Sequence, residues 1–218
     1  MNQMNLTAQI SKYEDEILTI PAVQLILSKL EKDLAPDLLY HSKLHALDVL
    51  HEVILFSILD NVPPKSIILL GVAAVFHDAG FLVQRSANEI FGAQMFAGAV
   101  AGDSRFSQQE IETGYQMILD TALVRQLESG ITSPTIPLST YLLDADVSNF
   151  GRDDFSEKME LYYSELKVDR QEYLEQTLGY LLAHTWHTKA ARSLREEKKQ
   201  ENLEQFKTLI ALSRFSPE

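Results

Sequence analysis

The chain has 218 residues, 45% of them hydrophobic, which is enough for one domain with a sizeable core. Its 31 acidic and 19 basic residues give a net charge of −12, and no stripe of lysine and arginine suits a phosphate backbone, which argues against nucleic-acid polymers and anionic membranes as partners. Cysteine is absent, so thiol nucleophiles, cysteine-ligated zinc and disulfides are excluded, and histidine and carboxylate remain as metal ligands.

The N-terminal region has no basic segment followed by an apolar core, so no secretory signal is expected. The longest apolar run, residues 67–76, is about half as long as the roughly 20 residues that a membrane-spanning helix needs. Together these features predict a soluble, cytoplasmic protein.

Helical periodicity and helix end signals recur along the chain, whereas alternating strand patterns are hard to find, which predicts an all-α fold. Pro21 is expected to open a helix that ends before the Ala-Pro-Asp sequence at 35–37. The next helix is expected to contain residues 40–50 and to end near residues 60–64. Residues 65–77 then form a helix with almost no polar face, so other parts of the protein must surround it.

Three polar pairs, each spaced by three residues, predict capped helix starts. They are Ser86 with Glu89, Ser107 with Glu110, and Asp169 with Glu172. Residues 129–137 are the clearest loop, and a helix is expected to follow over 138–147. A helix over 173–184 and a last one over about 189–214, rich in strong helix formers, complete the chain. No internal repeat or domain boundary is evident, which predicts a single-domain helical bundle.

The stretch YHSKLHALDVL at residues 40–50 places two histidines in an apolar run. If it is helical, four polar side chains share one narrow stripe, because each residue of a helix advances by about 100°. They are His41, His45, Asp48 and Glu52. A solvated polar face is the ordinary explanation of such a pair of histidines. However, apolar residues surround much of the helix, which indicates that the stripe lines a cavity.

His77 and Asp78 end the most hydrophobic helix of the chain. Burying an imidazole beside an ionised carboxylate is costly unless the two are paired or bind a metal, although a helix-terminal histidine followed by a turn aspartate is an alternative. Residues 142–151 offer a further carboxylate, from Asp144 or Asp146. Since these two point about 200° apart on a helix, only one can join a shared metal, and their spacing does not decide which.

The three motifs, in this order in an all-α chain, resemble the HD superfamily of metal-dependent phosphohydrolases. Within it, the stretches YHSKLHALDV and ADVSN are most similar to the catalytic core of cyclic-nucleotide phosphodiesterases. The resemblance covers residues 40–151 and implies a single HD-type helical bundle over residues 1–218, with a core at 36–151 and C-terminal helices at 152–218 that pack on it.

Carried over position by position, the resemblance implies four metal ligands, with the ADVSN match selecting Asp146 over Asp144. They are His45, His77, Asp78 and Asp146. His41 matches the family residue that protonates the leaving oxygen, so it is a catalytic candidate together with Asp78, which matches the residue that can bridge to a second metal. One or two divalent cations are therefore expected, and manganese, magnesium, iron, nickel and zinc are all candidates.

The chain departs from the phosphodiesterase pattern at several points. Ser42 stands where those enzymes carry asparagine, and Phe150 replaces the proline that follows their Ser-Asn. No histidine lies between the second and third motifs, which disfavours the branches of the superfamily that bind two metals with extra histidines.

Four polar side chains near the motifs are weaker candidates for the site. They are Asp48, Glu89, Arg85 and Lys43. Asp48 would hold a histidine ring N–H, and Glu89 would order a metal-bound water. Arg85 and Lys43 would attract an anionic substrate. His184 and His187 are expected three residues apart on a helix, where packing is favoured over a second metal site. Trp186 is expected to be a core or interface anchor.

The sequence thus predicts a hydrolase that acts on a small phosphoester, foremost a nucleotide, with a cyclic-nucleotide phosphodiester as one candidate. A bound divalent cation lowers the pKa of water and polarises a phosphoryl oxygen, while His41 protonates the leaving oxygen. A nucleoside monophosphate phosphatase and a metal-binding regulatory domain without turnover are the alternatives. The amphipathic terminal helices would suit a homodimer.

Overall fold

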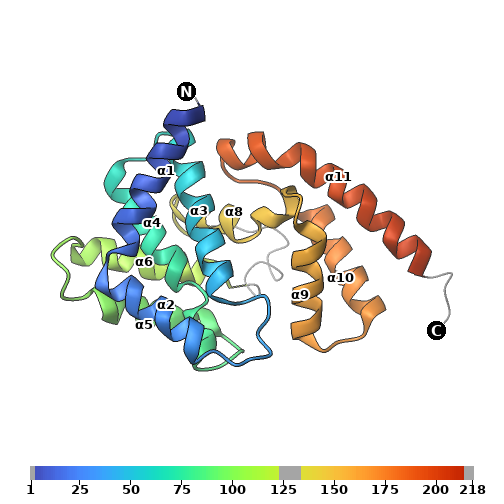
Figure 1. The fold of residues 1–218 in the computed structure, drawn as a ribbon, viewed down its shortest axis with the longest axis horizontal. Coiled ribbons are helices and arrows are strands. Elements are labelled where there is room, and N and C mark those ends of the chain that lie inside the picture. Colours follow the sequence, from blue (N-terminus) through green and yellow to red (C-terminus); the bar gives the residue numbers. More distant parts are fainter. Residues whose placement is uncertain (1–2, 123–133, 214–218) are drawn as a thin grey trace.

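The computed structural model describes residues 3–122 and 134–213. Within these ranges the chain has ten α-helices, two short 3₁₀-helices and no strand, so the all-α prediction is confirmed (Figure 1). The elements are α1 (Gln3–Leu18), α2 (Pro21–Lys32), α3 (Lys43–Leu59), α4 (Pro64–Phe76), η1 (Ala79–Leu82), α5 (Asn88–Val100), α6 (Gln108–Asp120), α8 (Ser139–Asp146), η2 (Ser148–Gly151), α9 (Phe155–Leu166), α10 (Arg170–Ala183) and α11 (Lys189–Ser213).

Helices α3 and α4 form the centre of the first part of the molecule. They pack on each other, α1 contacts both of them, and α5, α6 and α8 also pack on α4. Every residue of α4 from Leu69 to Phe76 is buried, as its uniformly apolar sequence predicts. By length and composition the segment Pro64–Leu82 could cross a membrane, but 67% of its most apolar window lies inside the protein, as in the core helix of a soluble protein.

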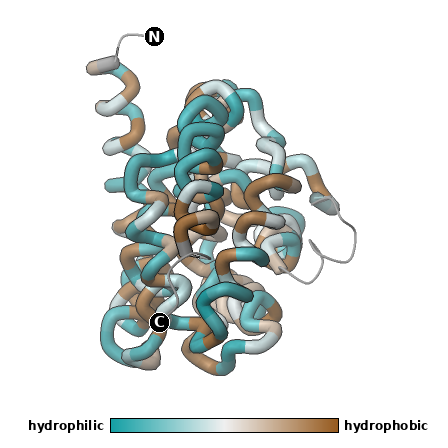
Figure 2. Tube along the Cα trace, turned by 90° about the vertical axis from the view of Figure 1, so that its right-hand side faces the viewer, coloured by the Kyte–Doolittle hydropathy of each residue, from teal (hydrophilic) through white to brown (hydrophobic). Residues whose placement is uncertain are grey.

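Helices α9, α10 and α11 form the other side of the molecule in Figure 1, and α8 and η2 lead the chain from one side to the other. The long helix α11 packs along η2, α10 and α3. Hydrophobic and hydrophilic residues alternate along most helices in Figure 2, as expected when one face packs and the other meets water. Trp186, just before α11, is only 2% exposed, which confirms its prediction as a core anchor.

Helix end signals explain several of the observed boundaries. Pro21 occupies the first turn of α2. Ser107 and Glu110 form a reciprocal capping box at the start of α6, and the Asp169 side chain accepts a hydrogen bond from the backbone N–H of Glu172 at 3.0 Å. The predicted loop at 129–137 lies mostly outside the described residues, and the helix expected after it is α8.

The capping box predicted at Ser86 and Glu89 is wrong. Helix α5 begins at Asn88, and the residue before it, Ala87, has a left-handed backbone with φ of 53°, so no side chain caps the helix. An N-cap residue normally has an extended backbone, which lets its side chain fold back onto the first turn. Here the chain turns sharply out of η1 into α5, and this turn replaces the cap.

Two glycines allow α5 to pack tightly on the turn that carries His77. A Cβ atom on Gly80 would lie 1.8 Å from the carbonyl oxygen of Asn88, and one on Gly92 would lie 2.7 Å from that of Phe76. No side chain fits at either position, so the backbones make direct contact. The end of α4 and η1 is therefore held firmly in place.

Two predicted helix extents are wrong, and both affect histidines. Helix α3 begins at Lys43, and Ser42 before it has an extended backbone, so His41 lies in the preceding loop and shares no helical stripe with His45. Helix α10 ends at Ala183, and His184 has an extended backbone, so His184 and His187 lie in the link to α11. Periodicity alone does not reveal these ends, because both segments continue a helix-compatible pattern.

Candidate metal centre

Four side chains from remote segments meet at the junction of α3, α4 and α8. Nε2 of His45 lies 3.1 Å from Oδ1 of Asp146 and 3.5 Å from Oδ2 of Asp78, and Nε2 of His77 lies 3.3 Å and 3.1 Å from the same two oxygens. The potential ligand atoms of His45, His77 and Asp146 all lie within 4.8 Å of one another. The two imidazoles and Asp146 therefore form a group that could hold a metal ion, and Oδ2 of Asp78 lies within 3.5 Å of both imidazoles.

The hydrogen bonds around His77 leave its inner nitrogen available as a ligand. Its Nδ1 lies 2.7 Å from the carbonyl oxygen of Ala74, which can only accept, so Nδ1 carries the proton. In a neutral ring Nε2 then keeps its lone pair. This atom and Oδ2 of Asp78 are buried and lie 3.1 Å apart, yet neither makes a hydrogen bond of acceptable geometry. Buried polar atoms are rarely left without a partner, and a cation between them would satisfy both.

The electrostatics of the cluster also fit a cation. Burial acts to lower the pKa of His77, but the charges of Asp78 and Asp146 outweigh it and raise that pKa well above its ordinary value. Burial acts to raise the pKa of Asp146, but His77 and His45 hold it far below the usual range, and the pKa of Asp78 is also lowered. A proton on His77 thus helps to balance the two carboxylates, and a divalent cation can replace it.

Histidine and carboxylate donors narrow the choice of metal only in part. Such mixed nitrogen and oxygen sets suit zinc, iron, nickel and manganese, whereas magnesium prefers oxygen alone. The described residues supply four such side chains, so a cation of higher coordination number would have room for water or substrate.

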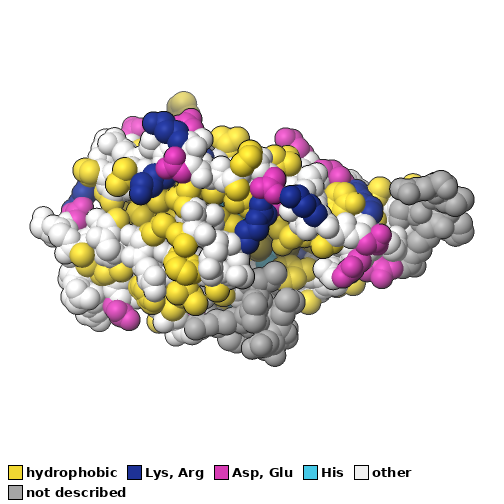
Figure 3. All heavy atoms as spheres, turned by 90° about the horizontal axis from the view of Figure 1, so that it is seen from below, with side chains coloured by type: hydrophobic (Ala, Val, Ile, Leu, Met, Phe, Trp, Pro, Cys, Tyr) yellow, Lys and Arg dark blue, Asp and Glu magenta, His cyan; other side chains and the backbone are white. Residues whose placement is uncertain are grey.

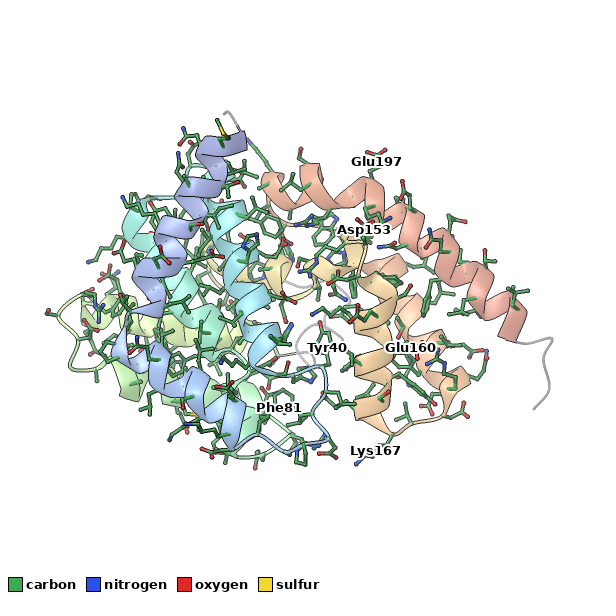
Figure 4. All side chains as sticks on the ribbon, in the orientation of Figure 1. Tyr40, Phe81, Asp153, Glu160, Lys167 and Glu197 are labelled. Atoms are coloured by element: carbon green, nitrogen blue, oxygen red, sulfur yellow. The ribbon has the colours of Figure 1, made fainter. Side chains whose placement is uncertain are left out.

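His41 lies beside this cluster, with its ring centroid 6.0 Å from that of His45. Its Nδ1 pairs with Oε1 of Glu165 on α9. The other oxygen of Glu165 accepts hydrogen bonds from the backbone N–H groups of Tyr40 at 3.0 Å and of His41 at 3.1 Å. One buried carboxylate therefore holds both the side chain and the backbone of His41. Figure 4 shows Tyr40 between α3 and α9.

Each partner of this pair favours the charged form of the other. Burial acts to lower the pKa of His41, but Asp78 and the bond to Glu165 outweigh it, so the net pKa is raised. Burial acts to raise the pKa of Glu165, but the bond to His41 lowers it overall. The protonated form of His41 is thus favoured relative to a free imidazole, and its Nε2 makes no hydrogen bond within the described chain.

A cavity of about 830 Å³ opens beside the cluster. Its wall includes His41, Asp78 and Asp146, and many of its other side chains are aromatic. These are Tyr40, Phe150, Tyr162, Tyr173 and Tyr180. Among the described residues that line it there is no lysine and no arginine. Seen from below, histidine atoms are visible in a recess of the surface (Figure 3). The cavity is large enough for a nucleotide-sized ligand.

The weaker candidates occupy different places. Glu89 lines the cavity, and burial together with Asp78 raises its pKa. No hydrogen bond joins Asp48 to His45 among the described residues, and the Asp48 carboxylate instead accepts a hydrogen bond from Lys158 at 2.6 Å. The structure therefore does not support Asp48 as the holder of that ring.

Both cationic candidates are in surface ion pairs. Lys43 lies 3.0 Å from Glu31, and Arg85 lies 2.7 Å from Asp37. Neither side chain lines the cavity, so a role in attracting an anion gains no support from their positions.

Asp144 points away from the cluster. Its carboxylate accepts hydrogen bonds from the backbone N–H groups of His187 at 3.0 Å and Thr188 at 2.7 Å, and from the Thr188 hydroxyl. It thus ties α8 to the start of α11. The two aspartates of the ADVSN region point to different sides of α8, as their spacing predicts, and Asp146 is the one that reaches the histidines.

His184 and His187 both line the cavity. Burial, with a smaller effect of Lys199, lowers the pKa of His184 to about 3, so its ring is neutral. The ring contacts Phe150 and Trp186 edge to face, at centroid distances of 5.4 Å and 4.4 Å. His184 therefore takes part in aromatic packing, in agreement with the role favoured for it from the sequence.

Sequence reasoning missed Glu165. Glu165 lies near the end of the amphipathic helix α9. No periodicity relates it to His41, which lies 124 residues earlier in the chain. Comparison with models of known protein families finds no match, and comparison with curated proteins finds no significant match. The chemistry of the centre is therefore inferred from its own side chains.

Proposed function

We propose that the protein is a metal-dependent phosphohydrolase of the HD type, in which His45, His77, Asp78 and Asp146 hold a divalent cation. The observation that carries the proposal is the convergence of these four side chains from three remote segments, two of which, Asp78 and Asp146, line a large cavity. When bound, the cation supplies an activated water and polarises a phosphoryl oxygen.

His41 acts as the general acid. Its ring lines the cavity beside the proposed ligands, and its Nδ1 is held by Glu165, which leaves Nε2 to give a proton to the departing oxygen. The raised pKa of His41 favours the protonated form of the ring. Glu165 thus orients the acid and favours its protonated form.

The lining of the cavity favours a phosphodiester over a phosphomonoester. A monoester carries close to two negative charges at neutral pH, and none of the described lining residues is a lysine or arginine that would offset them. A diester carries one charge, which the cation and His41 can balance. The aromatic walls suit a flat group such as a nucleobase. A nucleotide phosphodiester, cyclic or linear, is therefore the proposed substrate class.

The test combines metal analysis with a hydrolysis screen. The purified protein is assayed with manganese, magnesium, iron, nickel or zinc on paired cyclic nucleotides and nucleoside monophosphates, and its metal content is measured by elemental analysis. His41→Ala should bind metal normally and lose roughly 10² to 10⁴ in kcat, as expected when a general acid is removed. His45→Ala should lose both metal and activity.

His51→Ala is the matched control, since His51 lies on the same helix α3 but is 48% exposed and pairs with Glu14 at the surface. It should keep both metal and activity. If the protein bound metal but hydrolysed no ester, the result would favour a metal-binding regulatory domain over an enzyme. Preferential hydrolysis of monophosphates would contradict the charge argument, and failure to bind any metal would refute the site. The homodimer and the cytoplasmic location stay predictions.

A further inference from the structure

His41 is not held by a regular backbone. It lies in the loop before α3, where its own helical hydrogen bonds are absent, and its ring is tied down through Nδ1 by Glu165. One hydrogen bond fixes the position of one ring atom, but the plane of the ring can still tilt about it. A general acid needs its proton directed at the leaving oxygen, so another contact must set that plane.

Three aromatic rings surround the imidazole, and one of them lies nearly parallel to it. Phe81 stacks on its face with a centroid distance of 4.4 Å and an interplanar angle of 26°. Tyr40 and Tyr162 meet it edge-on, at 5.0 Å and 5.6 Å and at angles of 87° and 80°. A parallel face restricts tilt more than an edge does, and an aromatic face also attracts a protonated imidazole.

Phe81 is itself firmly placed. Its backbone N–H donates a hydrogen bond to the carbonyl oxygen of Asp78 at 3.1 Å, which closes the first turn of η1. The preceding Gly80 contacts the backbone of Asn88 so closely that no Cβ atom fits between them. The ring that stacks on His41 is therefore carried by a rigid turn that begins at a proposed metal ligand.

We propose that Phe81 is a positioning residue for His41, and that its ring sets the plane in which the imidazole delivers its proton to the leaving oxygen. This inference rests on the proposed phosphohydrolase function. Phe81 follows the proposed metal ligand Asp78 by three residues and stacks on His41, so it connects the second motif to the general acid. The alternative is that Phe81 only fills space beneath the loop.

The dependence of the rate on the leaving group separates these two roles. An alcohol leaving group must be protonated as it departs from the phosphodiester. A p-nitrophenolate leaving group departs without a proton. Phe81→Leu should lower kcat for the alcohol ester by roughly tenfold to a hundredfold, with KM nearly unchanged, as expected for a misplaced catalytic group. The p-nitrophenyl ester should lose about twofold or less. Phe81→Tyr keeps a parallel ring and should restore the rate.

Val83→Ala is the control, because Val83 ends the same turn but is 53% exposed and makes no ring contact with His41. It should leave both rates unchanged. An equal loss of kcat on both esters in Phe81→Leu would show a purely structural role and overturn the inference. Unchanged rates on both esters would overturn it as well.

A second readout does not depend on turnover. In zinc-loaded protein with ¹⁵N-labelled histidine, the Nδ1 proton that His41 shares with Glu165 should give a downfield resonance, identified by its loss in Glu165→Gln. Phe81→Leu should broaden or remove this signal, while Phe81→Tyr and Val83→Ala keep it. A sharp, unshifted signal in Phe81→Leu would refute the positioning role. If the wild-type protein hydrolysed neither ester, the proposed function would fail, and this comparison would still decide whether Phe81 orients His41.

Discussion

At the scale of single residues, the candidate site depends on ionisable side chains that set each other's charge. Glu165 uses one oxygen for the His41 ring and the other for two backbone N–H groups, and its side chain is only 3% exposed. A carboxylate with these partners favours its ionised form and therefore favours the imidazolium beside it. Glu165 therefore affects both the position and the charge of His41.

Glu165→Gln should move the alkaline limb of the activity profile to lower pH. The pKa of His41 is raised in the folded protein, so activity that needs the imidazolium persists above about 6.5, its ordinary pKa, and falls as pH rises through the raised value. Removal of the Glu165 charge lowers the pKa of His41, and the fall should begin at lower pH. Profiles of kcat/KM against pH for the metal-loaded proteins test this.

Glu160→Gln provides the comparison for Glu165→Gln, because Glu160 lies on the same helix α9 but pairs with Arg170 at the surface. Its profile should match that of the wild type. An alkaline limb that stays in place in Glu165→Gln would contradict the role given to this pair.

The sequence identifies the residues that belong to short motifs and misses those that do not. The structure brings together His45, His77, Asp78 and Asp146, which the motifs select. Glu165 and Phe81 reach His41 from other segments, and their sequence surroundings are those of ordinary helix residues. A contact of this kind depends on the tertiary packing of α9 and η1, which periodicity does not encode.

At the scale of elements, two serines with the same local pattern behave differently. Ser107 accepts a hydrogen bond from the backbone N–H of Glu110, whose carboxylate in turn accepts from the N–H of Ser107 at 2.8 Å. Ser86 makes no such cap, because Ala87 takes a left-handed backbone ahead of α5. The serine and glutamate pattern therefore forms a cap only where the chain enters the helix from an extended conformation. At the start of α5, the tight packing of η1 on this helix prevents that conformation.

Ser107→Ala should lower the free energy of unfolding by about 1 kcal/mol, the usual cost of a lost N-cap. Urea denaturation of the metal-free protein measures it. Hydrogen bonds from Lys65 and Ser107 lower the pKa of Glu110 to about 2, so its contribution is present above its unfolded pKa and is lost as pH falls toward 2. The difference between the two proteins should therefore shrink in acid.

Ser86→Ala is the matched test of the failed pattern, since Ser86 is exposed and its hydroxyl makes no cap. It should change stability by less than about 0.5 kcal/mol. A loss as large as that of Ser107→Ala would mean that Ser86 caps α5 after all.

At the scale of the whole molecule, the candidate site draws on both sides of the fold. The proposed metal ligands belong to α3, the end of α4 and α8, whereas Glu165 and much of the aromatic wall belong to α9 and α10. A buried ion pair joins these sides. Glu52 of α3, with a side chain only 4% exposed, accepts hydrogen bonds from Arg195 of α11 at 2.6 Å and 2.8 Å.

The ion pair between Glu52 and Arg195 is not predictable from the sequence. The helical stripe placed Glu52 beside His45, facing a cavity, but the structure pairs Glu52 with a residue 143 positions later in the chain. The direction of the side chain on α3 follows from its spacing. Its partner depends on how α11 folds back across η2 and α3, and only the assembled molecule determines that.

Arg195→Met should destabilise the whole protein, because it leaves the Glu52 carboxylate buried without its main partner. Loss of one member of a buried pair costs about 3 to 5 kcal/mol, and the lower end is expected since Arg152 still lies 3.8 Å from Glu52. Urea unfolding should show one cooperative transition at lower denaturant. Lys198→Met, on the same helix, breaks only surface pairs with Asp153 and Glu201 and should cost less than about 1 kcal/mol.

A double variant with Glu52→Leu and Arg195→Met separates the loss of the ion pair from the loss of packing. It removes the stranded carboxylate, so it should regain much of the stability lost in Arg195→Met, as buried pairs replaced by apolar residues commonly do. If the double variant were less stable than Arg195→Met, the cost would lie in packing between α3 and α11 rather than in an uncompensated charge. Equal stability of Arg195→Met and Lys198→Met would show that the pair does not hold the two sides together.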